Sequence, residues 1–172
     1  MVQEKTETKF GLVALSEASD IPIGVYQRHG LTEVNHTSYG SVIKTPYYDK
    51  NRSEIGAKFL LSTDPSDYIW RKDSNPYGCA LYGAHELDTA YQKGYVYLAY
   101  NEIDCITLWH NDLPAVALPD TATWNEHTIR KYLGDDRIGK VFVLTDAETV
   151  INRMKGSAIS DKFLLTKRGG TS

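Results

Sequence analysis

The hydrophobic pattern at the start of the chain predicts two short helices. Apolar residues recur at helical spacing over residues 10–18. Residues 19–30 predict a second helix, with Ser19 or Asp20 as its N-cap and Gly30 as its stop. We therefore expect the chain to begin with a small helical entry.

A β-hairpin is predicted next. Residues 41–49 and 54–62 alternate apolar and polar side chains, and the polar residues 49–53 between them are typical of a turn. Residues 68–70 predict a third strand. Residues 71–78 carry several turn-forming residues and two adjacent cations, which predicts an exposed loop.

The second half of the chain alternates strictly between strand and helix. After a helix predicted over residues 81–94, apolar runs typical of strands are separated by amphipathic segments typical of helices. The predicted strands are residues 95–100, 114–119, 140–146 and the short run 162–166, and the predicted helices are residues 102–111, 123–133 and 147–156.

Such alternation is typical of a parallel sheet with helices on both faces. The predicted fold class is therefore α/β, with a small parallel sheet flanked by helices and preceded by an α+β lobe that contains the hairpin. The lobe is expected to span residues 1–94, and the sheet domain residues 95–172.

Carboxylates follow two of the predicted strands. Glu102 and Asp104 come after the first strand, and Asp146 and Glu148 come after the third. Ligands of parallel sheets bind beyond the carboxyl ends of the strands, and Mg²⁺ prefers a few carboxylates. The alternative is that these acids only stabilise helix N-termini, by about 0.3–1 kcal/mol each.

Composition and charge narrow the choice of partner. The net charge is −3 and the pI is about 5.9, which argues against a generally basic nucleic-acid binder but allows a local basic groove. Cys79 and Cys105 show no metal-ligand spacing, and we expect both to be reduced. The charged N-terminus and the lack of a long apolar segment predict a cytoplasmic protein without membrane contact.

Basic and aromatic side chains of the first lobe are candidates for contacts with nucleic acid. The cations could neutralise phosphates and the rings could stack on unpaired bases. The alternative is that the rings pack between the lobes while the cations are only solvated. The candidate residues are Lys44, Lys58, Trp70, Arg71, Lys72, Tyr77 and Tyr82.

The order of these motifs resembles that of the Toprim domain of primases and related proteins. The resemblance is carried by YNEIDCITLW (residues 100–109), LPAVALPDTATW (113–124) and KVFVLTDAE (140–148). Upstream, residues 45–59 and the segment 68–83 with its Leu-Tyr-Gly run resemble the subdomain that precedes Toprim in bacterial and phage primases. Together the resemblance covers residues 20–166.

The resemblance implies roles for the acids and also shows departures from the family pattern. It implies catalytic roles for Glu102, Asp104 and Asp146, with Mg²⁺, if a cofactor is retained, bound by these three and Glu148. Tyr100 stands where the family places its first Glu. A phenol with a pKa near 10 is a poor general base or metal ligand at neutral pH.

Two further positions depart from the pattern. Asn101 stands at a Gly position, where it is expected to keep a left-handed turn. Asp120 replaces another Gly, and the acidic motif that usually follows the last strand is missing.

The leading hypothesis is a catalytically impaired Toprim or primase-like protein of phage or mobile-element origin. It is expected to bind nucleic acid or a nucleoprotein complex, with a host defence or replication system as a further candidate target. One alternative is an active Mg²⁺-dependent primase or nuclease. The other is an acidic mimic of nucleic acid that inhibits a basic partner protein.

Overall fold

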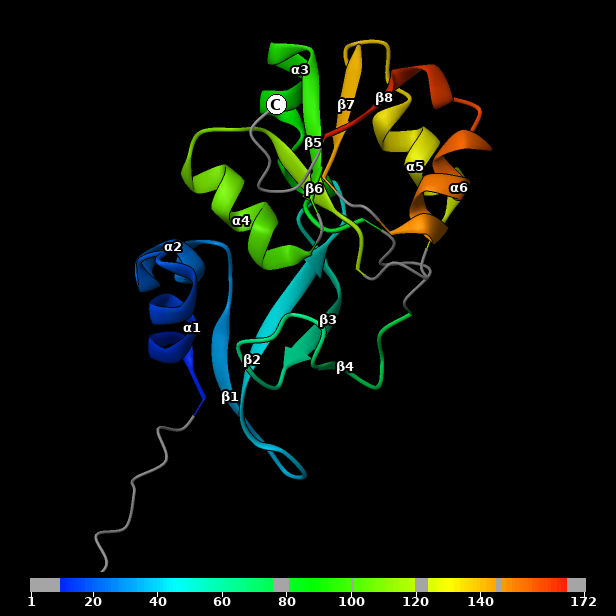
Figure 1. The fold of residues 1–172 in the computed structure, drawn as a ribbon. Helices are drawn as coiled ribbons and strands as arrows, with labels where there is room; N and C mark the ends of the chain where they lie inside the picture. Colours follow the sequence, from blue (N-terminus) through cyan, green and yellow to red (C-terminus); the bar gives the residue numbers. More distant parts are fainter. Residues whose placement is uncertain (1–9, 76–80, 100, 120–123, 145–146, 167–172) are drawn as a thin grey trace, which may run out of the picture.

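The computed structural model describes residues 10–75, 81–99, 101–119, 124–144 and 147–166. Figure 1 shows an antiparallel sheet in the lower part of the molecule and a parallel sheet with helices above it. This arrangement confirms the predicted α/β fold class. No helix within the described ranges is long and apolar enough to cross a bilayer.

The first sheet has four antiparallel strands in the order β1-β2-β3-β4. Its bounds are β1 Thr32–His36, β2 Gly40–Tyr48, β3 Glu54–Leu60 and β4 Tyr68–Trp70. The predicted hairpin is confirmed as β2 and β3. The Asp49 carboxylate closes the turn by accepting the backbone N–H groups of Asn51 and Ser53, at 2.9 and 3.0 Å.

Strand β1 was not predicted. It pairs with β2 along its whole length, but it is largely exposed and carries Glu33, Asn35 and His36. Because neither of its faces is fully buried, it lacks the apolar alternation by which strands are recognised.

The two N-terminal helices are α1 Leu12–Ser19 and α2 Ile23–Arg28. The prediction that Ser19 or Asp20 caps the second helix is wrong. Asp20 lies in the left-handed region at the end of α1, and the N-cap of α2 is Pro22, which makes no side-chain cap bond. The fixed φ of proline suits the helix start. Gly30 follows α2 with φ of 84°, as expected of its stop.

The second sheet is parallel throughout, with strands in the order β6-β5-β7-β8. The strands are β5 Tyr95–Ala99, β6 Ala115–Ala117, β7 Lys140–Val143 and β8 Phe163–Leu165. The helices are α3 Asp88–Lys93, α4 Glu102–His110, α5 Glu126–Leu133 and α6 Glu148–Lys155, with short 3-10 turns η1 Ala84–Glu86 and η2 Ser160–Lys162.

The helix predicted over residues 81–94 is shorter than expected. Gly83 has φ of 88° and separates the apolar residues before it from η1, and α3 begins only at Asp88. The predicted end at Gly94 is confirmed, because Gly94 takes the left-handed conformation that caps α3.

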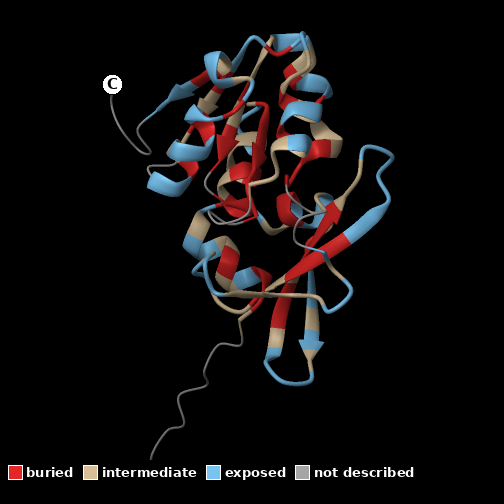
Figure 2. Ribbon diagram, turned by 90° about the vertical axis from the view of Figure 1, so that its right-hand side faces the viewer, coloured by how far each residue is buried: buried red, intermediate tan, exposed pale blue. Residues whose placement is uncertain are grey.

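Alternate residues of the central strand β5 point to two different cores. Val96 and Leu98 belong to a cluster with α3, α5 and α6, whereas Ala99 belongs to a cluster with α1, α2, α4 and the first sheet. Figure 1 shows α4 above and beside α2, and Figure 2 shows buried strand segments in both sheets. The cluster that contains Ala99 therefore joins the two sheets.

Tyr82 lies at this junction. Its backbone exchanges two hydrogen bonds with Ala117 of β6, at 2.7 and 3.0 Å, and its side chain is 1% exposed. Its ring packs against Tyr47 of β2 and Trp109 of α4, with centroid distances of 5.1 and 5.6 Å. The backbone of the next residue, Gly83, is therefore tightly constrained.

We expect Gly83→Ala to lower the free energy of unfolding by about 1–3 kcal/mol, because a side chain at positive φ is strained. A Cβ atom there would also lie 2.7 Å from Cζ2 of Trp109. Urea denaturation followed by tryptophan fluorescence measures the change. Gly24→Ala in α2 is the matched control, since nothing lies within 4 Å of its added Cβ. Equal stabilities of the two variants would contradict the predicted constraint.

Candidate functional site

The candidate acids lie at the carboxyl ends of two neighbouring parallel strands. Glu102 and Asp104 are in the first turn of α4, directly after β5, and Glu148 is in the first turn of α6, after β7. This is the edge at which ligands of parallel sheets bind. Tyr100 and Asp146 lie outside the described residues, so their expected roles stay predictions.

Asn101 differs from its expected conformation. Its φ of −158° and ψ of 177° are extended, so the predicted left-handed turn is wrong at this position. Instead its side-chain oxygen accepts the backbone N–H of Asp104 at 2.9 Å and caps α4. Asn suits this position because its short side chain reaches the first free N–H groups of the helix.

Glu102 is engaged in a buried ion pair with Lys58. The distance from Nζ of Lys58 to Oε2 of Glu102 is 2.8 Å, and both side chains are 1% exposed. The Tyr47 hydroxyl donates a hydrogen bond to the same Oε2 atom, at 2.7 Å. Lys58 also donates to the carbonyl oxygen of Pro119. The pair therefore ties β2 and β3 of the first sheet to α4 and the end of β6.

Aromatic rings complete the surroundings of Lys58. Its Nζ atom lies 3.7 Å from the centre of the Tyr68 ring and 5.4 Å from that of Trp70. A desolvated ammonium is attracted to the face of such rings. Lys58 was a candidate for contacts with nucleic acid, but in this structure its charge is directed inward at Glu102 and β4.

The acids that the structure describes do not fit a metal site as a set. Oε1 of Glu102 is buried and accepts no hydrogen bond from any residue in the described ranges, so it is the one oxygen of this carboxylate that could ligate. However, the ammonium of Lys58 already neutralises the charge, and a cation would have to be bound beside it. Among the described ranges, no group of three His, Cys, Asp or Glu side chains is arranged to hold a metal ion.

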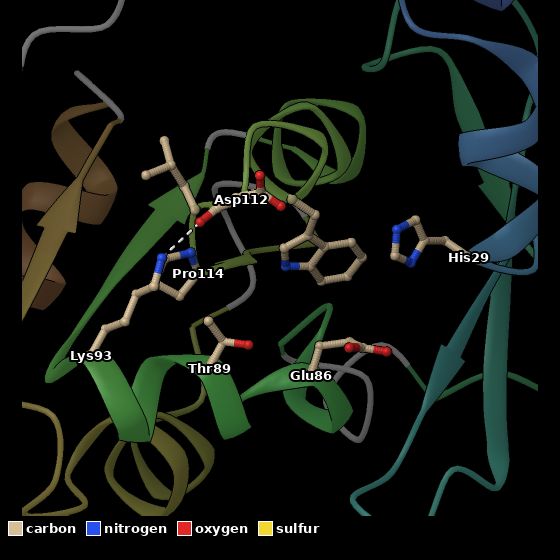
Figure 3. Close-up of a pocket in the computed structure, with 8 residues that line it drawn as sticks. His29, Glu86, Thr89, Lys93, Asp112 and Pro114 are labelled. Atoms are coloured by element: carbon tan, nitrogen blue, oxygen red, sulfur yellow. Dashed lines mark hydrogen bonds between the residues drawn. The ribbon is translucent and has the colours of Figure 1, made fainter.

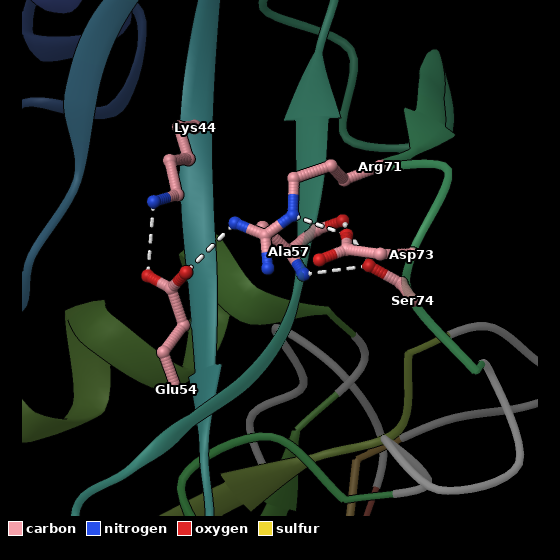
Figure 4. Close-up of polar contacts among 6 residues, drawn as sticks. All are labelled: Lys44, Glu54, Ala57, Arg71, Asp73 and Ser74. Carbon is pink, nitrogen blue, oxygen red and sulfur yellow. Dashed lines mark hydrogen bonds and ion pairs between the residues drawn. The ribbon is translucent and has the colours of Figure 1, made fainter.

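Lys44 and Arg71 are held on the outer side of the hairpin by acids (Figure 4). Glu54 accepts from Lys44 at 2.9 Å and from Arg71 at 2.7 Å, and Arg71 also binds Asp73 at 2.5 Å. Burial raises the pKa of Glu54, but the bonds from Arg71 and Lys44 outweigh this effect and lower the pKa below its ordinary value. This cluster is therefore neutral as a whole at neutral pH.

The other candidates for nucleic-acid contact differ in how far they are exposed to solvent. Lys72 is exposed and forms no ion pair with any residue in the described part of the chain. Trp70 is half-buried beside Tyr47, at a centroid distance of 5.3 Å. Tyr82 is in the core, so its ring packs between the sheets, as the alternative prediction stated. Tyr77 lies outside the described residues.

Tyr47 is the residue of this site that the sequence did not reveal. It is 1% exposed and is the only hydroxyl seen to donate to Glu102 within the residues described. Its inward direction follows from the alternation of β2, but the partner on α4 is 55 residues away in the chain. Sequence spacing carries no signal for such a contact.

A separate cavity of about 380 Å³ lies beside α3 and α4 (Figure 3). His29, Glu86 and Trp109 line it, and Nζ of Lys93 donates to the carbonyl oxygen of Asp112 at 2.9 Å. The His29 and Trp109 rings lie 4.5 Å apart, and burial is the main cause that lowers the pKa of His29. Of the predicted catalytic acids, the two with described positions, Glu102 and Asp104, do not line this cavity.

We expect Lys58→Met and Glu102→Gln each to destabilise the protein by about 3–5 kcal/mol, because each leaves one partner of a buried ion pair uncompensated. The double variant should cost about 1–3 kcal/mol less than the sum of the two, since neither uncompensated charge remains in it. Urea denaturation of all four proteins measures this coupling. Additive losses would show that the two side chains do not depend on each other.

Comparisons with known proteins agree with this architecture. No protein-family model and no curated protein sequence matches the chain. Solved structures do match. The primase fragment of the bacteriophage T7 primase-helicase protein has a TM-score of 0.67 and 16% identity, over 87% of this chain and 62% of that chain.

Two bacterial primases match to a similar degree. The Escherichia coli primase catalytic core has a TM-score of 0.64 and 16% identity, over 94% of this chain and 70% of that chain. The RNA polymerase domain of Mycobacterium tuberculosis primase DnaG has a TM-score of 0.67 and 9% identity, over 96% of this chain and 68% of that chain. This protein thus has the fold of the Toprim-containing catalytic cores of bacterial and T7 primases, of which it spans about two thirds.

Proposed function

We propose that this protein is a primase-like binding protein that engages nucleic acid or a nucleoprotein complex and has lost most or all phosphoryl-transfer activity. The observation that carries the proposal is the engagement of Glu102 by Lys58 and Tyr47 in a fully buried site. The fold supplies the relation to primases, and this contact supplies the argument for impaired catalysis.

The loss of activity is argued from charge. Phosphoryl transfer depends on metal ions and cations placed to stabilise the charge of the transferring group. Here the sequence places Tyr100 at the position of an acid, and the carboxylate of Glu102 is already neutralised by Lys58. Asp104, Asp146 and Glu148 would then have to bind Mg²⁺ without these two positions.

Binding to nucleic acid is argued from the surface and from the structural neighbours. Lys72 and the half-buried Trp70 lie together at the end of β4 and could contact a phosphate and a base. Among the neighbours are a DnaG primase catalytic domain bound to ssDNA and T7 primase domains bound to an RNA/DNA hybrid. The proposal includes a phage or mobile-element origin. It also includes a host protein as a target, and a pull-down from the native host would identify that protein.

We expect no primer synthesis and no strand cleavage by the wild-type protein with either Mg²⁺ or Mn²⁺. A gain-of-function pair gives a sharper test of the cause. Tyr100→Glu should raise Mn²⁺ affinity at least several-fold by restoring a carboxylate, whereas Tyr100→Phe should not change it. Electron paramagnetic resonance of free Mn²⁺ measures both. Metal-dependent product from the wild-type protein that disappears in Asp146→Ala would show instead that the site is active.

We expect the wild-type protein to bind single-stranded DNA at low salt, with an affinity that falls steeply as salt rises. Each phosphate contact contributes a slope of about −0.7 in a plot of log K against log salt concentration. Lys72→Gln should make the slope less steep by about this amount. Fluorescence anisotropy of a labelled oligonucleotide measures it. Absence of binding at low salt together with capture of a basic protein would favour the nucleic-acid mimic.

A further inference from the structure

A groove of about 410 Å³ lies away from the candidate acids, between the first sheet and the outer helices. Three segments line it: the turn between β2 and β3, the η1–α3 segment, and the C-terminal end of α5 with the loop that follows it. None of the predicted catalytic or nucleic-acid-binding residues that the structure describes lines it. The groove is therefore a separate site.

The charge of this groove is opposite to that of the whole protein. Among the described residues, its lining includes four cations, Lys50, Arg52, Lys131 and Arg137, and two acids, Asp88 and Asp135. Burial, as the main cause, lowers the pKa of His85, so this residue adds no positive charge at neutral pH. The lining thus has an excess of two positive charges in a chain with a net charge of −3.

The four cations divide into two that are held by acids and two that are not. Asp135 binds the guanidinium of Arg137 at 2.9 and 3.0 Å, and Glu86 binds Arg52 at 3.1 Å. Lys50 and Lys131 are exposed and form no ion pair with a residue in the described ranges. These two ammonium groups come from different segments that line one groove, so they are available to a ligand with more than one negative charge.

Two aromatic rings accompany the cations. Tyr91 and Tyr132 line the groove and are both half-buried. The guanidinium carbon of Arg137 lies 3.8 Å from the centre of the Tyr91 ring, and Nζ of Lys131 lies 5.3 Å from that of Tyr132. Alternating cations and rings suit a ligand that offers both phosphates and flat bases.

We propose that this groove binds single-stranded nucleic acid, with Lys50 and Lys131 contacting successive phosphates and Tyr132 stacking on an unpaired base. A single strand is favoured over a duplex because only unpaired bases expose their faces to a ring. The volume of the groove lies within the range of about 300–1,000 Å³ that is typical of ligand sites. The ligand is of the class named in the proposed function, but the site is a different one.

The test compares three variants for binding of a fluorescein-labelled oligo(dT) by anisotropy at several salt concentrations. Lys50→Gln/Lys131→Gln removes the two unpaired charges of the groove. Lys140→Gln/Lys155→Gln removes two exposed charges outside it and keeps the same net charge. Lys72→Gln tests the candidate face near β4. All substituted side chains are exposed, so we expect unchanged unfolding transitions.

The groove variant is expected to bind about ten-fold more weakly, with a salt slope less steep by about 1.4, while the control pair stays near the wild-type value. Equal binding by the groove variant and the control pair would overturn the proposal, whatever Lys72→Gln does. Loss in the groove variant alone would support the groove and contradict the face near β4. If inorganic triphosphate displaces the oligonucleotide at an equal concentration of phosphate groups, the groove binds a small phosphate ligand, and the proposal of a single strand is rejected.

Discussion

The ion pair between Lys58 and Glu102 is the interaction on which the arrangement of the two sheets depends. Both charges are almost fully removed from water, and the charge of Lys58 on β3 is balanced by that of Glu102 on α4, in the other half of the molecule. An isolated buried charge costs several kcal/mol, so neither sheet could adopt its observed packing alone without rearranging this position. A buried ion pair adds little net stability, but this one favours a single arrangement of α4 against the first sheet. It also places the ammonium of Lys58 beside Glu102, a carboxylate that could otherwise bind a metal ion.

A row of aromatic rings continues from this pair to the opposite side of the junction. Trp70 contacts Tyr47, Tyr47 contacts Tyr82, and Tyr82 contacts Trp109, with centroid distances between 5.1 and 5.6 Å. Trp109 in turn contacts His29 at 4.5 Å. Since packed interiors deform little, each ring restricts the positions that its neighbours in the row can adopt. The row therefore connects Tyr47, which binds Glu102, with the cavity that His29 and Trp109 line.

The sequence predicted the second sheet well because its strands are short apolar runs, and a helix follows each of β5, β6 and β7. It did not predict β1, whose polar side chains show no buried face, nor the break at Gly83, where φ is positive and Trp109 leaves no room for a Cβ atom. The contacts within the candidate site were harder to predict from the sequence. Lys58 and Glu102 were assigned to different roles, on phosphate and on metal, because nothing in their spacing shows that β3 and α4 meet. The cations of the outer groove were missed for the same reason, since they come from segments far apart in the chain.

The long separation within the buried pair bears on how the protein is made. Lys58 also donates to Pro119, which follows it by 61 residues. Domains generally fold as units, N-terminal first, while the ribosome adds about 5–20 residues per second. All four strands of the first sheet are thus synthesised about 2–6 s before Glu102, the ion-pair partner of Lys58. During this interval the ammonium of Lys58 lacks the carboxylate from α4 and depends on water for its solvation.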